Sequence, residues 1–66
     1  MTVKEVEARV AEIRMGRRDS EVAGSNECAL WSDVLRAIAS GRGDDPAQLA
    51  HAAIATSNIQ FSRWYA

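Results

Sequence analysis

Cys28 and His51 are the two side chains of this sequence best suited to covalent or metal chemistry. A thiolate beside an imidazole makes a nucleophile with its base, and both groups also ligate zinc. A metal site would have to add Glu27 and Asp33, but the four residues lack the ligand spacing of known metal sites. Cys28 opens an apolar run, where a thiol packs as a small hydrophobe, and His51 stands between alanines. We therefore predict no enzymatic activity, no metal and no cofactor.

A cluster of arginines is the second group of side chains that could bind a ligand, because guanidinium groups bind phosphates. Arg14, Arg17 and Arg18 lie close together in the sequence, and Arg36 could join them. Eight basic and nine acidic side chains give the chain a net charge of −1, however, and nonspecific nucleic-acid binding usually needs a basic excess. A small nucleic-acid-associated regulator is therefore the alternative interpretation, and nucleic acid is not the expected partner.

Three of the four aromatic residues, Phe61, Trp64 and Tyr65, fall in the last six positions. Chain ends are usually polar, so an aromatic end must pack on its own core or on another chain. The candidate partner-binding set is Phe61, Trp64 and Tyr65 as apolar anchors with Arg63 as a rim contact. Trp31 lies in the middle of an expected helix, where we expect it to belong to the core.

Apolar spacing and capping residues predict an all-α fold, a small three-helix domain with a helical C-terminal extension. The chain forms a single domain, 1–66, with helices at about 3–15, 20–40 and 46–57. Residues 58–65 either continue the third helix or recap as a separate one. No stretch alternates between polar and apolar residues for long enough to form a strand.

Local signals support these boundaries. Thr2 and Glu5 fit a capping box, and Asp45 followed by Pro46 is a typical helix start. The first helix carries one apolar stripe, formed by Val3, Val6, Val10 and Ile13. Gly24 leaves open whether the second helix kinks or breaks. A helix continued past residue 58 would place Ile54, Phe61 and Tyr65 on one face.

The size of the domain favours self-association. Sixty-six residues seldom bury a core that is stable without a disulfide, a metal or an oligomer, and one cysteine cannot form an internal disulfide. We expect a protein partner or a second copy, with a homodimer favoured over a monomer. No apolar stretch is long enough for a membrane, and the first residues lack the apolar segment of a signal peptide. A cytoplasmic location with a reduced thiol is the expectation.

Three runs of the sequence, 33–41 (DVLRAIASG), 45–50 (DPAQLA) and 56–64 (TSNIQFSRW), carry a resemblance over most of the chain. Together they resemble short uncharacterised proteins of actinobacteria and actinobacteriophages, which similarly end in an aromatic, basic, tryptophan sequence. Those proteins have an acidic, histidine-containing segment before the second helix, whereas residues 21–27 of this chain contain no histidine. The resemblance implies no site residue, because these proteins have no established activity. By analogy, it implies a small host-directed or regulatory protein.

Taken together, these patterns indicate a noncatalytic small helical protein-interaction module. It would bind a protein partner or itself through the aromatic C-terminal segment, whose partner-binding residues are Phe61, Arg63, Trp64 and Tyr65. The alternative is the nucleic-acid-associated regulator, with Arg14, Arg17, Arg18 and Arg36 as its phosphate-binding residues.

Overall fold

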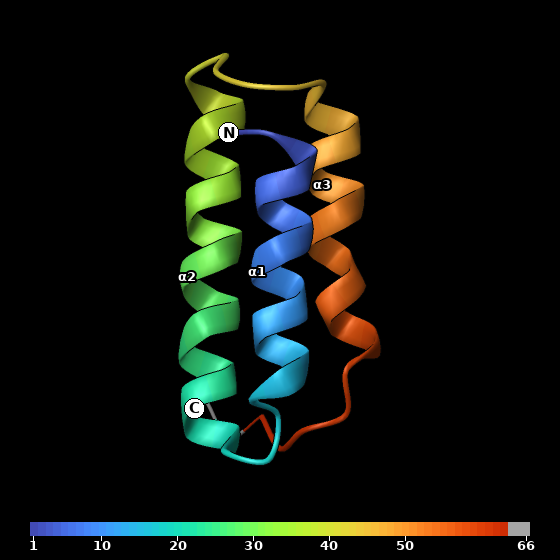
Figure 1. Ribbon diagram of the computed structural model, residues 1–66. Coiled ribbons are helices and arrows are strands. Elements are labelled where there is room, and N and C mark those ends of the chain that lie inside the picture. Colours follow the sequence, from blue (N-terminus) through green and yellow to red (C-terminus); the bar gives the residue numbers. More distant parts are fainter. Residues whose placement is uncertain (64–66) are drawn as a thin grey trace.

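Three helices pack side by side in a computed structural model, which describes residues 1–63 (Figure 1). They are α1 (Val3–Met15), α2 (Ser20–Ala39) and α3 (Pro46–Ile54), and a 3₁₀ turn, η1 (Ala55–Asn58), follows α3 directly. The helix α2 runs opposite to α1 and α3, so the short connections lie at the two ends of the bundle. Residues 1–63 contain no strand, which confirms the predicted all-α fold.

Side-chain caps fix where each helix begins. The Thr2 hydroxyl accepts the Glu5 N–H at 3.1 Å while the Glu5 carboxylate accepts the Thr2 N–H at 3.1 Å, which is the predicted capping box. Asp19 accepts the Val22 N–H at 3.2 Å at the start of α2. Asp45 accepts the Ala47 N–H at 2.8 Å at the start of α3. The three predicted helix starts are therefore confirmed.

The second helix passes through Gly24 without a break. Gly24 is buried there, as are Ala23 and Glu27. The question left open by the sequence is settled in favour of one continuous α2 of 20 residues. Such a helix is about 30 Å long.

The predicted helical extension is wrong for residues 59–63. Ile59 is extended, with φ −84° and ψ 126°, and the residues that follow have no regular secondary structure. The chain turns at Ile59 because this side chain enters the core, where it is only 3% exposed. Ile54 and Phe61 therefore do not share a helical face, and Trp64 and Tyr65 lie outside the described residues.

The core is built from one stripe of each helix and from Ile59. Val6, Val10 and Ile13 are buried, so the predicted stripe of α1 packs within its own chain, with Val3 half-buried beside it. Leu30 and Leu49, both fully buried, contribute the largest side chains of α2 and α3 to this core. The remaining members are Ala23, Val34 and Ala53.

The loop between α2 and α3 holds the start of α1. The Val3 N–H donates to the Asp44 carboxylate at 2.8 Å, and the Asp44 N–H donates to the Met1 carbonyl at 3.0 Å. Gly43 has a positive φ of 96°, and a Cβ at this position would overlap the Met1 carbonyl oxygen. The loop therefore needs glycine there, and it fixes α1 relative to the top of α2 in Figure 1.

Candidate interaction surface

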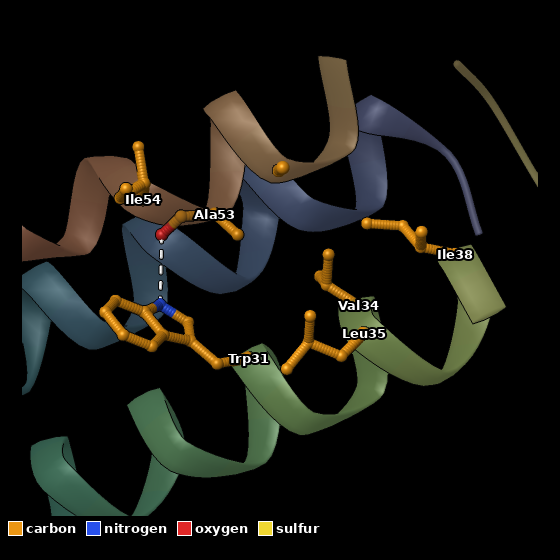
Figure 2. A pocket seen from close by; sticks show the side chains of 7 residues that line it. Trp31, Val34, Leu35, Ile38, Ala53 and Ile54 are labelled. Atoms are coloured by element: carbon orange, nitrogen blue, oxygen red, sulfur yellow. Dashed lines mark hydrogen bonds between the residues drawn. The ribbon is translucent and has the colours of Figure 1, made fainter. Parts of the chain in front are cut away.

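Three of the five exposed large apolar side chains of residues 1–63 gather on one side of the bundle, and the other two, Met15 and Val22, lie outside this group. Leu35 of α2 is 66% exposed, Ile54 of α3 is 57% exposed, and Trp31 of α2 is 40% exposed. These three side chains surround an open hollow of about 180 Å³ between α2 and α3 (Figure 2). We call this surface the α2–α3 groove, and its lining consists of Trp31, Val34, Leu35, Ile38, Ala50, Ala53 and Ile54.

Small side chains on α3 explain why the groove is hollow. Ala50 and Ala53 face it from α3, and methyl groups leave room that larger residues would fill. On α2, Val34 points into the core while the adjacent Leu35, about 100° further round the helix, projects from the surface. Leu35 shares one apolar stripe of α2 with Trp31 and Val34, and the small side chains of α3 cover only part of that stripe.

Trp31 is held rigidly at the edge of the groove. Its indole N–H donates to the Ala53 carbonyl at 3.2 Å (Figure 2) and also to the Thr56 hydroxyl at 3.0 Å. The ring therefore bridges α2 to the end of α3. Thr56 itself is fully buried. The expectation that Trp31 belongs wholly to the core is therefore wrong, because its polar edge is satisfied internally while part of the ring faces solvent. Such a fixed, amphipathic aromatic is the typical anchor of a protein interface.

Charge is missing from the lining of the groove. All seven lining residues are apolar. Cys28, Trp31, Leu35 and Ile38 are spaced three, four and three residues apart along α2, which is the heptad pattern of helices that pack on other helices. On α3, Ala47, Ala50 and Ile54 repeat the spacing of three and four. The groove is thus an uncharged apolar surface with helical periodicity on both of its helices.

The other end of α2 is closed by the C-terminal segment. Arg63 donates two hydrogen bonds to the Glu27 carboxylate, both at 3.0 Å, and further bonds to the carbonyls of Thr56 at 2.9 Å and Ile59 at 3.1 Å. Its guanidinium also lies 3.9 Å from the ring centre of Phe61. We call the group Glu27, Thr56, Phe61 and Arg63 the sealed end.

Glu27 is the charged centre of the sealed end, and its side chain is only 7% exposed. Burial raises the pKa of Glu27, but the hydrogen bonds from Arg63 and Thr56 and the charge of Arg63 outweigh it. The pKa of Glu27 therefore lies below its ordinary value. The carboxylate stays ionised at neutral pH and holds the C-terminal segment by a bidentate, charge-assisted contact.

The predicted partner-binding set is therefore divided by the structure. Phe61 is half-buried and packs against the core, and Arg63 binds Glu27, so both contact their own chain. Trp64 and Tyr65 lie outside the described residues. The α2–α3 groove is an exposed apolar surface of residues 1–63 that the sequence did not single out. The heptad spacing of Trp31, Leu35 and Ile38 was the signal that could have found it.

Cys28 and His51 do not come together. Both are exposed, but Cys28 lies beside Glu27 and Arg63, whereas His51 lies beside Glu7 on the side of α3 that faces α1. Within residues 1–63, no three side chains of the His, Cys, Asp and Glu types are grouped to hold a metal ion. The structure therefore assembles neither of the two chemical sites that the sequence raised.

The arginines considered for phosphate binding are divided between the two ends of the bundle. Arg14 lies in the last turn of α1 and Arg36 in the last turn of α2, and these helices run in opposite directions (Figure 1). Arg17 donates to the Arg14 carbonyl at 2.9 Å, and Arg18 is exposed next to it. Arg36 therefore cannot join the other three in one phosphate site.

Comparison of the chain with protein-family models, with curated proteins and with solved structures gave no match. The resemblance to short actinobacterial and actinobacteriophage proteins accordingly stays a prediction. Within residues 1–63, no helix has both the length and the apolar character needed to cross a bilayer.

Proposed function

We propose that this protein is a noncatalytic helical interaction module that binds another polypeptide through the α2–α3 groove. The observation that carries the proposal is the group of Trp31, Leu35 and Ile54, which stand exposed around one uncharged hollow. Exposed apolar patches with a fixed aromatic anchor are typical of protein interfaces.

A helix is the element that suits this groove best. Two helices that expose apolar residues at heptad spacing can accept a third helix between them, as in a four-helix bundle. The occupant would bring apolar side chains at positions i, i+3, i+4 and i+7, because those positions share one helical face. Trp31 would then be fully desolvated and supply the largest part of the binding free energy.

The aromatic C-terminal segment enters the proposal in a narrower form. Phe61 and Arg63 hold the segment to the bundle, and the proposed binding residues of this segment reduce to Trp64 and Tyr65. Arg63, the last described residue, lies beside Cys28 and Trp31 and therefore close to the α2–α3 groove. We also propose that the module works in the cytoplasm, with Cys28 reduced. A host-directed or regulatory role fits the resemblance to phage proteins.

Site-specific photocrosslinking tests the proposal. A photoreactive phenylalanine at position 35 should form adducts with another polypeptide in an extract of the cells in which the protein naturally occurs. The matched control is the same group at Val22, which is 50% exposed on α2 but outside the groove. Adducts at position 35 and none at position 22 support the proposal. Equal adducts at both positions, or none at either, contradict it.

A further inference from the structure

We infer that the occupant of the α2–α3 groove is a second copy of this chain, related by a two-fold axis that sets the two α2 helices antiparallel. This inference rests on the proposed function, since it names the partner of the same groove. Every feature that the groove requires of an occupant is present on α2 itself. That helix is 20 residues long and carries an uncharged apolar strip at heptad spacing on its exposed side.

The groove contains both a ridge and a hollow. Leu35, two-thirds exposed, is the ridge, and it stands directly beside the hollow between Trp31 and Ile54. In a two-fold dimer the same patch of both copies forms the interface, so this patch must be complementary to itself and contain both a protruding side chain and a hollow. An axis near the middle of the strip lets Leu35 of each copy enter the hollow of the other and cover Trp31.

The charges on α2 favour the antiparallel arrangement. Arg36 is exposed next to Leu35, on the flank of the strip. A parallel pair would place the two Arg36 side chains at the same level, whereas an antiparallel pair separates them along the helix axis. The antiparallel pair also opposes the two helix dipoles. Because all the lining residues are apolar, closing the interface buries no charge.

The size of the face agrees with a weak dimer. The apolar strip of α2 from Cys28 to Ile38 is about 16 Å long, and two packed helices make a face about 20 Å wide, so each copy buries about 300 Å². The total of about 600 Å² is in the range of weak, transient interfaces. We therefore expect a dissociation constant in the micromolar range.

Sedimentation of the full chain across concentrations from about 1 µM to about 1 mM tests the inference, since this range brackets a micromolar constant. The average mass should rise from one chain toward two. Leu35→Glu should raise the dissociation constant at least about tenfold, because the interface would have to bury a carboxylate. Val22→Glu, which adds the same charge to α2 outside the groove, should leave it unchanged. Circular dichroism must show that both variants keep their helices.

Crosslinking tests the geometry. In a Cys28→Ser background, Leu35→Cys should be joined into a dimer by a short bismaleimide, whereas Asn26→Cys should not. Asn26 is exposed nine residues from Leu35 and therefore on the opposite side of α2. Crosslinking at position 26 alone would overturn the inference.

The outcomes separate this inference from the proposed function. A chain that stays monomeric at about 1 mM overturns the second copy as occupant. If photocrosslinking at position 35 then captures a different protein, the groove is still a docking site and only the partner was wrong. If position 35 forms no adduct of any kind, both the inference and the proposed function fail.

Discussion

The two ends of α2 meet the rest of the molecule in opposite ways. At the sealed end, Glu27 is buried under the C-terminal segment and paired with Arg63 through two hydrogen bonds. At the other end, the α2–α3 groove is lined by apolar side chains, and Leu35 and Ile54 are more than half exposed. Trp31 lies on the boundary and lines both regions.

The difference shows what each region is suited to do. A buried ion pair contributes little net stability, but it fixes geometry, because each charge needs its partner in place. The sealed end therefore determines where the C-terminal segment lies. An uncharged apolar surface has the opposite properties. Its burial against any element of complementary shape lowers the free energy, and no particular partner group is needed. Residues 1–63 cover one end of α2 and leave the apolar face of the other end exposed.

Among the substitutions of polar contacts, the largest effect is expected from Arg63→Ala. The substitution leaves Glu27 buried with its charge unpaired, which should lower the free energy of unfolding by about 2–4 kcal/mol. The value is set below the 3–5 kcal/mol typical of fully buried pairs, because about a third of the Arg63 side chain is exposed. Chemical denaturation of both proteins at neutral pH measures the change.

Arg9→Ala is the control for this prediction. Arg9 and Asp33 form an ion pair at 2.8 Å that is more exposed than the pair at the sealed end, so its loss should cost less than about 1 kcal/mol. If Arg63→Ala costs no more than Arg9→Ala, the sealed end holds nothing in place and the contrast between the two ends of α2 disappears.

The fold was largely predictable from the sequence because its determinants are local. The Thr2–Glu5 capping box and the Asp45–Pro46 start are recognisable in a few adjacent residues, and both are present in the structure. The stripe of α1 was equally clear, since Val6, Val10 and Ile13 follow the helical period. The course of residues 59–63 could not be predicted in this way. It depends on the entry of Ile59 into the core and on a contact between residues 36 positions apart.

The candidate site was less predictable, for a related reason. Apolar spacing shows which residues share a helical face, but it does not show how much of that face a neighbouring helix covers. Leu35 and Val34 are adjacent and equally apolar, yet Val34 is buried and Leu35 is not. The sequence prediction chose the C-terminal segment because three of the four aromatic residues cluster there. Phe61 contacts the core of its own chain.

Trp31→Phe is expected to have the next largest effect. Phenylalanine keeps the aromatic ring but removes the N–H that binds the Ala53 carbonyl and the Thr56 hydroxyl. The free energy of unfolding should fall by about 1–2 kcal/mol, because the buried Thr56 hydroxyl loses its donor, while the Ala53 carbonyl keeps the hydrogen bond from that hydroxyl. In a double-mutant cycle with Thr56→Ala, the two losses should not add. Additive losses would mean that Trp31 does not bridge the two regions.

Acid should release the sealed end. The folded pKa of Glu27 lies below its unfolded value, so the ion pair stabilises the fold fully above the unfolded pKa. That contribution is lost as the pH falls through the folded pKa, since the neutral acid no longer attracts Arg63. Unfolding free energies from neutral pH down to about pH 3, below the ordinary glutamate pKa, should fall more steeply for the wild type than for Glu27→Gln. Parallel curves would contradict the role given to this carboxylate.

Leu35→Ala should have the smallest effect on the monomer, and this makes it the strictest test of the comparison. Two-thirds of the Leu35 side chain is already in water, and alanine is the better helix former, so the free energy of unfolding should change by less than about 0.5 kcal/mol at low protein concentration.

The matched control is Leu30→Ala on the same helix. Leu30 is fully buried, so its truncation should cost about 2–5 kcal/mol. A loss at Leu35 that approaches the loss at Leu30 would make the groove part of the monomer's core. A negligible loss, combined with weaker self-association, would show that Leu35 serves binding rather than folding.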